Sequence, residues 1–364
     1  MRFVKLLLLL ACTAAPVGIV QGQVPAGYPA DYPKIVDAAK KEGKVVVYST
    51  TDAKLVQGLI KDFEAAFPGV KVQYTDMNST EVYNRFISEN AAGAASADAV
   101  WSSSMDLQLK LAADGLAMVY KSPESAALPE WARWKDTVYA TTFEPIAIVY
   151  NKRLVSADEV PKTHADFTKL LTTKADKFQK KVTTYDAEKS GVGFMLVNQD
   201  AKLNPGFWDL VKAMGARGVN MQSSTGTMME RVASGENLIG YNILGSYALT
   251  RAKKDPSIGI AFTSDYNLVL SRLAFVAKNA KNPNAGKLFV DYLLSKRGQT
   301  VTAEQAELYS IRTDITGKDS GVAFAKELGS AVKPIAVSDD LLVGLDPTKR
   351  LDFLKQWQSA LGRK

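Results

Sequence analysis

The chain has 364 residues, of which 46% are apolar and 23% are charged, and its formal net charge is +7. This composition is ordinary for a folded protein, and the length suits about two domains of the common size. The aromatic content (5 Trp, 14 Tyr and 14 Phe) argues against intrinsic disorder. One Cys and one His exclude a disulfide scaffold and zinc sites of the Cys/His type. Because the positive charge is spread along the chain, no nucleic-acid partner is expected.

Residues 1–22 are typical of a secretory signal peptide. Arg2 and Lys5 form a basic start, a short leucine-rich run follows, and small residues near Gly22 offer a cleavage site. The uninterrupted apolar run is much shorter than the ~20 residues of a membrane span. We therefore predict export to the periplasm, with lipoprotein anchoring through Cys12 as the alternative.

Strand and helix patterns alternate over residues 45–115. Short β-branched or alternating runs at residues 45–48, 70–74 and 99–101 predict three strands. Helical spacing follows each of them: over residues 55–67 up to Pro68-Gly69, in a helix capped by Ser79, and in a helix ending at Gly115. This alternation predicts a parallel sheet covered by helices.

A second α/β unit is predicted from residue 147 onward. Strands are expected at residues 147–150, 182–185 and 238–241, and extended segments at 258–262 and 268–276. One helix is expected to begin at Ser190, one to end at Gly235 and one to begin near Ser246. Further helices are expected over residues 207–214, 283–294, 300–309 and 351–357. Because no clear linker separates the two lobes, we expect the chain to cross between them near residues 141–145 and 264–272, with a ligand cleft between them.

Hydroxyl-rich turns follow three of these strands and open helices. In a parallel sheet the carboxyl ends of strands face the ligand crevice, and helix N-termini there favour anions. The candidate ligand-binding residues are Ser49, Thr50 and Thr51; Ser102, Ser103 and Ser104; and Ser190, Gly191 and Gly193. The alternative is that these hydroxyls serve only as helix caps.

Further candidate ligand-binding residues are Thr142, Glu144, Tyr241, Asn242 and Tyr247. The tyrosines could bind ferric iron, donate hydrogen bonds or simply pack, and Glu144 could equally be a solvated surface group. Arg251, Arg272 and Arg312 could clamp an anion, but we interpret them, like His164, as surface residues. The sequence contains neither a G-x-S-x-G nor an H-E-x-x-H motif, which argues against a secreted hydrolase. We expect a protein that binds its ligand without enzymatic activity.

Several stretches, in order along the chain, resemble bacterial periplasmic solute-binding proteins of ABC importers, specifically the branch that binds ferric iron, organophosphates, phosphonates and sugar phosphates. These stretches are residues 45–49, 97–102, 149–152, 233–241, 274–283 and 289–295, with Gln299 and Ile311-Arg312. The resemblance covers nearly the whole chain after residue 22.

The resemblance implies a type II fold of two α/β lobes that close on a ligand around a β-hinge. We expect lobe boundaries at residues 23–142 plus 272–300 for the first lobe and 143–271 for the second, with residues 301–364 forming C-terminal helices across both. Iron-binding members carry adjacent tyrosines past the strand predicted to end at Tyr241, whereas here Tyr241 and Tyr247 are separated by five residues. Such members often have a His or another ligand in the first turn, where this chain has Ser49-Thr50-Thr51-Asp52.

The separated tyrosines and the hydroxyl-rich first turn both differ from the iron-binding members. They favour a small anionic organic solute, phosphorylated or carboxylated, over ferric iron. We predict a monomeric binding protein that delivers this solute to an inner-membrane ABC permease and needs no cofactor or resident metal. The alternatives are ferric iron as the transported ligand, and a ligand-presenting subunit of a sensor system.

Overall fold

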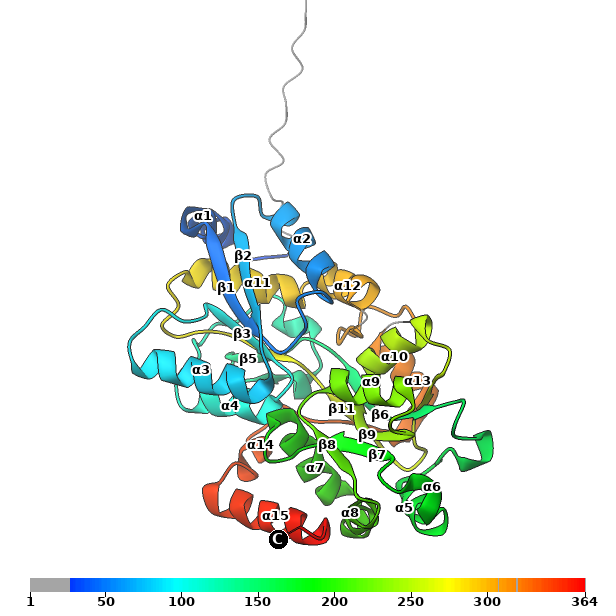
Figure 1. Ribbon diagram of the computed structural model, residues 1–364. Coiled ribbons are helices and arrows are strands. Elements are labelled where there is room, and N and C mark those ends of the chain that lie inside the picture. Colours follow the sequence, from blue (N-terminus) through cyan, green and yellow to red (C-terminus); the bar gives the residue numbers. More distant parts are fainter. Residues whose placement is uncertain (1–26, 307, 319, 364) are drawn as a thin grey trace, which may run out of the picture.

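The computed structural model describes residues 27–363 except 307 and 319, so the predicted signal peptide and Cys12 lie outside the described residues. Two β-sheets, each flanked by helices, are stacked one above the other along the molecule (Figure 1). We call the first sheet with its helices lobe 1 and the second sheet with its helices lobe 2. This arrangement confirms the predicted two-lobed α/β fold.

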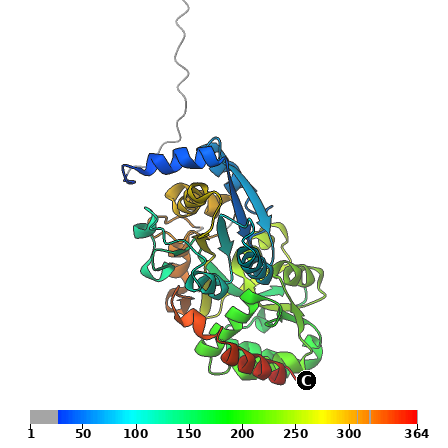
Figure 2. The same ribbon diagram turned by 90° about the vertical axis from the view of Figure 1, so that its left-hand side faces the viewer.

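The sheet of lobe 1 has the strand order β2-β1-β3-β12-β5-β4. The strands are β1 (Lys44–Ser49), β2 (Lys71–Asp76), β3 (Ala99–Ser102), β4 (Arg133–Trp134), β5 (Val138–Ala140) and β12 (Leu273–Val276). β1 pairs in parallel with β2 and β3, and β12 closes against β3 in the antiparallel sense. The helices are α1 (Tyr32–Glu42), α2 (Gln57–Ala66), α3 (Ser79–Ala91), α4 (Met105–Ala113), α11 (Pro283–Leu294) and α12 (Lys296–Gln305). In Figure 2, α1 runs across the end of the molecule that lies opposite the C-terminus.

The sheet of lobe 2 has the order β13-β11-β6-β9-β7-β8, and β10 also pairs with β6. The strands are β6 (Glu144–Asn151), β7 (Val182–Tyr185), β8 (Asn220–Gln222), β9 (Ile239–Leu244), β10 (Ile258–Ala261), β11 (Asn267–Leu270) and β13 (Val332–Pro334). The helices are α5 (His164–Thr173), α6 (Ala175–Phe178), α7 (Gly191–Leu203), α8 (Phe207–Ala216), α9 (Thr225–Ser234) and α10 (Gly245–Lys254). The chain ends with α13 (Gly321–Leu328), α14 (Asp340–Val343) and α15 (Pro347–Ala360), and α15 packs on α8.

Two short connections join the sheets. β5 of lobe 1 is followed after three residues by β6 of lobe 2, and β11 of lobe 2 is followed after two residues by β12 of lobe 1. The connections lie side by side, because the Thr141 N–H donates to the Arg272 carbonyl at 2.9 Å and the Arg272 N–H donates to Thr142 Oγ1 at 2.8 Å. Both connections fall within the segments where crossings were predicted, whereas the lobe boundaries themselves stay a prediction.

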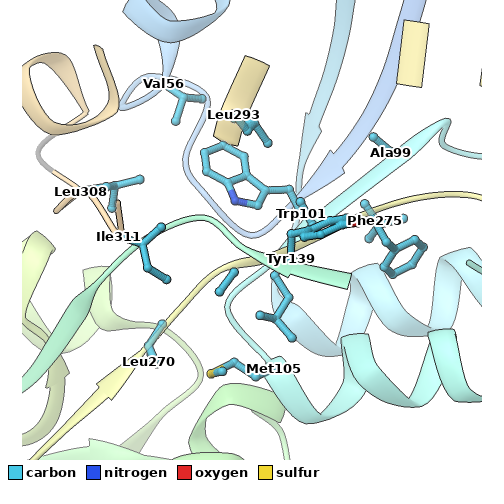
Figure 3. Packing of buried hydrophobic residues seen from close by; sticks show 14 of the residues in the cluster. Val56, Ala99, Trp101, Met105, Tyr139, Leu270, Phe275, Leu293, Leu308 and Ile311 are labelled. Carbon is cyan, nitrogen blue, oxygen red and sulfur yellow. The ribbon is translucent and has the colours of Figure 1, made fainter. Parts of the chain in front are cut away.

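Among the described residues, one hydrophobic cluster reaches from the helices of lobe 1 past these connections into lobe 2. Trp101 on β3 is 1% exposed, and its indole N–H donates to Thr141 Oγ1 at 2.7 Å. Figure 3 shows Trp101 and Tyr139 in the same part of this cluster, with Met105 and Leu270 below them. A buried indole with a satisfied N–H combines a large packing area with a fixed orientation. The first connection is therefore anchored directly to the core of lobe 1.

The structure confirms most predicted elements and corrects several boundaries. The strand predicted to end at Tyr241 runs on to Leu244, and the helix predicted at residues 300–309 is α12, which begins after the cap Ser295. Asn78 rather than Ser79 caps α3, because the Asn78 side chain accepts the Glu81 N–H. The helix start predicted around His164 is that of α5, whereas α1 was not predicted.

Candidate functional site

A pocket of about 300 Å³ lies between the carboxyl ends of strands in both lobes. Residues that follow β1, β2 and β3 form its lobe 1 wall, and residues around β7, β8, β9 and α9 form its lobe 2 wall. This is the place where open α/β sheets bind ligands. The lining residues are Thr50, Asp52, Asp76, Met77, Asn78, Ser79, Ser103, Tyr185, Val192, Ser223, Ser224, Thr225, Gly226, Leu244 and Tyr247. We call it the inter-lobe pocket.

On the lobe 1 side, Thr50 and Ser103 form the floor of the inter-lobe pocket and are hydrogen-bonded to each other. The Ser103 N–H donates to Thr50 Oγ1 at 2.8 Å, and the Thr50 hydroxyl donates to Ser103 Oγ at 3.1 Å. β1 and β3 are neighbours in register, which places the two turns together. The first two hydroxyl-rich turns of the sequence therefore meet in space.

Helix N-termini from both lobes face the inter-lobe pocket. α3 opens after Asn78, which forms a capping box with Glu81. α9 opens after Ser224, whose Oγ accepts the Thr227 N–H at 3.2 Å. The first N–H groups of a helix lack partners within it and carry a partial positive charge. Each of the two lobes therefore presents a helix N-terminus with partial positive charge to the pocket.

The third hydroxyl-rich turn lies where the lobes touch. Ser190 caps α7 by accepting the Gly193 N–H at 3.2 Å. The Gly191 N–H donates to Thr80 Oγ1 and the Val192 N–H to Ser79 Oγ, both at 3.2 Å across the lobe interface. The start of α7 is thus held by hydroxyl groups of α3, and the turn forms part of the contact between lobes.

Glu144 and Arg272 form a fully buried ion pair between the two connections, so our interpretation of Arg272 as a surface residue was wrong. Arg272 Nη2 donates to Glu144 Oε2 at 3.1 Å, and Nε lies 2.8 Å from Glu144 Oε1. The Thr142 hydroxyl donates to Glu144 Oε1 at 2.9 Å, and the Ser246 hydroxyl donates to Glu144 Oε2 at 2.7 Å. Burial opposes the charged guanidinium, but attraction to Glu144 outweighs it and raises the pKa of Arg272.

Arg272 also reaches the floor of the inter-lobe pocket. Its Nη1 donates to Thr50 Oγ1 at 3.3 Å, and its guanidinium lies 5.9 Å from the ring centroid of Tyr247. Burial raises the pKa of Tyr247 to about 12, although Arg272 acts to lower it. The Tyr247 phenol therefore stays protonated near neutral pH and can donate a hydrogen bond.

Tyr241 and Asn242 belong to a separate cluster inside lobe 2. The Tyr241 hydroxyl and the Asn242 amide donate to Asp200 Oδ2 at 2.9 and 2.7 Å, and the Tyr266 hydroxyl donates to Asp200 Oδ1 at 2.9 Å. Burial raises the pKa of Asp200. These residues line a cavity of about 10 Å³, room for about one water, and not the inter-lobe pocket.

Two more surface interpretations were wrong. His164 is buried, stacks on Tyr266 and lies 3.0 Å from Asp265 through Nδ1. Arg312 is buried and pairs with Glu124 and Asp314. Both side chains gain partners from distant segments, which a pattern of neighbours along the chain cannot indicate. Arg251 is exposed, as predicted.

Of the predicted residues, the structure brings Thr50, Ser103 and Tyr247 into the wall of the inter-lobe pocket. Behind that wall lie buried Ser49, Thr51, Ser102, Ser104, Thr142 and Glu144. Sequence reasoning missed Asn78, Ser79, Tyr185 and the segment 223–226, which also line the pocket. Ser223-Ser224-Thr225 precedes a predicted helix and carries the same hydroxyl-rich signal as the three chosen turns, so it could have been found.

A buried carboxyl lies close to the lobe interface in the first turn of α4. Asp106 Oδ1 accepts the Ser104 hydroxyl at 2.9 Å and the Leu107 N–H at 2.8 Å. Burial raises the pKa of Asp106 from 3.8 to about 6, although these hydrogen bonds lower it. An acid whose pKa is higher in the folded state stabilises the fold below pH 4, and this contribution is lost as the pH rises through 6.

We expect Asp106→Asn to raise the free energy of unfolding by about 1–3 kcal/mol at pH 7.5 and to change it little at pH 4, because the amide cannot ionise. Urea denaturation at both pH values measures this. Asp209→Asn, in the exposed first turn of α8, is the matched control and should change the free energy of unfolding by no more than about 0.5 kcal/mol. An equal effect of Asp106→Asn at both pH values would contradict the assignment.

Within residues 27–363, as far as they are described, no helix combines the length and apolar character of a membrane span. In the same part of the chain, His, Cys, Asp and Glu side chains nowhere gather in threes as a metal site would require. A two-lobed α/β protein with a polar pocket between its lobes is the architecture of a binding protein for small solutes.

The chain belongs to the bacterial extracellular solute-binding proteins, whose family model matches residues 58–325. It is similar to the crystal structure of the substrate-binding protein of an ABC transporter from Agrobacterium tumefaciens, with 38% identity and a TM-score of 0.84 over 87% of this chain and 94% of that one. Both are proteins that bind solutes, and the second does so for a transporter.

More distant structures share the fold. Iron-bound HitA from Pseudomonas aeruginosa is 18% identical with a TM-score of 0.68, covering 87% of this chain and 99% of that one. AfuA from Actinobacillus pleuropneumoniae, with exogenous fructose-6-phosphate bound, is 19% identical with a TM-score of 0.70, covering 88% and 99%.

Proposed function

We propose that this protein is the solute-binding component of an ABC importer and that it captures a small anionic organic solute in the inter-lobe pocket. The observation that carries the proposal is the chemistry of the two facing walls. Hydroxyl groups and helix N-termini come from both lobes, and no Lys or Arg is among the described lining residues. Such walls recognise a phosphate or carboxylate through N–H and O–H donors.

The same pocket carries two acceptors for a second part of the solute. Asp52 and Asp76 line it, and one oxygen of Asp76 already accepts the Ala53 N–H at 2.9 Å. Carboxylates accept hydrogen bonds from hydroxyl groups and repel a second anion. We therefore infer a solute with one anionic group at the helix N-termini and hydroxyl groups facing these carboxylates, such as a phosphorylated polyol or sugar.

The cellular setting of the proposal follows from the predicted signal peptide and the family. We propose that the mature protein is a periplasmic monomer that hands its solute to an inner-membrane ABC permease. A ligand-presenting role in a sensor system uses the same pocket and differs only in the partner. Capture of a permease or of a sensor's periplasmic domain by the ligand-loaded protein distinguishes the two.

The first test is a thermal-shift and calorimetry panel of fructose 6-phosphate, fructose, inorganic phosphate and ferric citrate. We expect the sugar phosphate to bind and fructose not to. A ligand at 100 times its Kd should stabilise the protein by about 2.7 kcal/mol. Tyr247→Phe should weaken binding by roughly 10-fold, since it removes one donor from a charged partner. Binding of fructose but of no phosphorylated compound would contradict the proposal.

Ferric iron is the second candidate, because two tyrosines and two carboxylates share the inter-lobe pocket. Phenolate and carboxylate oxygens are hard ligands that suit a hard cation. Against it, burial raises the pKa of Tyr247 to about 12 and so disfavours the phenolate. A visible phenolate-to-iron charge-transfer band on addition of ferric citrate, lost in Tyr247→Phe, would establish iron in place of the organic anion.

A further inference from the structure

The Thr50 hydroxyl, at the floor of the inter-lobe pocket, already uses its full hydrogen-bonding capacity within the protein. Its oxygen accepts from the Ser103 N–H at 2.8 Å and from Arg272 Nη1 at 3.3 Å. Its proton is donated to Ser103 Oγ at 3.1 Å. A hydroxyl has one donor and two acceptor positions, and all three are filled here.

The direction of the Thr50–Ser103 hydrogen bond follows from this count. The two groups that point at Thr50 Oγ1, an amide and a guanidinium, can only donate. They take both acceptor positions of Thr50, so Thr50 must be the donor to Ser103. Ser103 then accepts from Thr50, and its own proton is left over. Among the described residues no acceptor for that proton is found, while Ser103 lines the pocket.

Arg272 adds charge to this chain of hydrogen bonds. It is fully buried and held in place by Glu144, so its guanidinium cannot turn toward a solute. A hydrogen bond from a cation polarises the hydroxyl that accepts it, and the effect passes along a chain of hydroxyls. The fixed cation therefore makes the last hydroxyl, that of Ser103, a stronger donor.

We propose that Ser103 donates the hydroxyl hydrogen bond to the anionic solute, and that Thr50 is a positioning residue that links Ser103 to Arg272. The sequence alone makes Thr50 and Ser103 equivalent candidates, whereas the geometry gives them different tasks. This inference rests on the proposed function for its ligand, but the proton arrangement is a property of the protein alone.

Neutron diffraction from deuterated crystals tests the proton arrangement directly and does not depend on any solute. We expect the Thr50 deuteron on the line to Ser103 Oγ and the Ser103 deuteron directed into the inter-lobe pocket. A Thr50 deuteron in the pocket, or a Ser103 deuteron directed at Thr50, would overturn the proposal whether or not the protein binds anions.

Binding affinities for fructose 6-phosphate and inorganic phosphate, measured by calorimetry, test the division of tasks. We expect Ser103→Ala to weaken binding by roughly 10- to 100-fold. Thr50→Val should weaken it by about 10-fold, because Ser103 loses both its orientation and its link to Arg272. Thr50→Ser should bind about as tightly as the wild-type protein, since serine keeps the hydroxyl.

The double variant Thr50→Val/Ser103→Ala shows whether Thr50 acts through Ser103 or whether each residue contacts the solute independently. If Thr50 acts through Ser103, Thr50→Val combined with Ser103→Ala binds no more weakly than Ser103→Ala alone. The proposal would be overturned if the double variant lost affinity by the product of the two single losses. It would also be overturned if Thr50→Val bound as tightly as the wild-type protein. Thr172→Val, at an exposed position of α5 with its hydroxyl bonded to its own helix, is the matched control. Wild-type protein that binds neither anion would instead contradict the proposed function, leaving neutron diffraction to decide on the relay.

Discussion

Arg272→Met is expected to lower the free energy of unfolding by about 3–5 kcal/mol, measured by urea denaturation. The variant keeps much of the side-chain volume but leaves the Glu144 carboxylate buried without its cation. Arg272 and Glu144 are both 0% exposed, so water cannot replace the lost partner. The two connections between the lobes also lose the group that joins them, which adds to the effect.

Two further variants separate the ion pair from general packing. Combining Arg272→Met with Glu144→Gln should recover at least half of the lost stability, because no unpaired charge then stays buried. Arg297→Met is the matched control: Arg297 pairs with Asp62 at 2.7 Å, but its side chain is 56% exposed, so a loss within about 1 kcal/mol is expected. An equally small loss for Arg272→Met would contradict the role assigned to the buried pair.

Gly191→Val is expected to weaken solute binding by roughly 100-fold while leaving each lobe folded, an effect of the size of ~3 kcal/mol. A Cβ at Gly191 would lie 2.6 Å from Leu107 Cδ1 and 2.9 Å from Ser104 Oγ, both on the other lobe. Gly191 opens α7 without a positive φ, so its backbone tolerates a side chain. The substitution therefore acts as a wedge between the lobes.

Small-angle scattering and calorimetry together test the wedge. We expect a larger radius of gyration for Gly191→Val than for the wild-type protein, a normal circular dichroism spectrum, and weak binding of the tightest anion in the panel. Gly206→Val, at the N-cap of α8, is the control, because the nearest atom to its Cβ is Asn204 Oδ1 at 3.4 Å. Wild-type affinity with an unchanged radius of gyration would show that the contact at Gly191 does not limit closure.

The sequence predicts those parts of the fold that depend on neighbours along the chain. β-branched runs and helical spacing identify β1, β3, α7 and α11 because strand and helix formation depends on local periodicity. Hydroxyl-rich turns identify Thr50 and Ser103 because strand ends in a parallel sheet meet at one edge. The same rule, applied to Ser223-Ser224-Thr225, would have found the opposite wall.

Pairings across long distances could not be predicted in this way. Glu144 and Arg272 are 128 positions apart, and only the two crossings bring them together. A lone charged residue in the sequence is most often solvated, so burial of both was not expected. Tyr241 was interpreted as a ligand candidate from its position at the end of a strand, but the strand continues and the phenol donates to Asp200 inside lobe 2.

The hydroxyls of Ser79 and Thr80, which receive the first N–H groups of α7, have a consequence for the energetics of closure. On separation of the lobes, water would take over as acceptor for both amides, so each bond contributes only about 1 kcal/mol net. These two bonds therefore add only a small bias toward the form in which the lobes touch. A solute that binds both walls shifts the population toward that form by the difference in its affinity for the two forms.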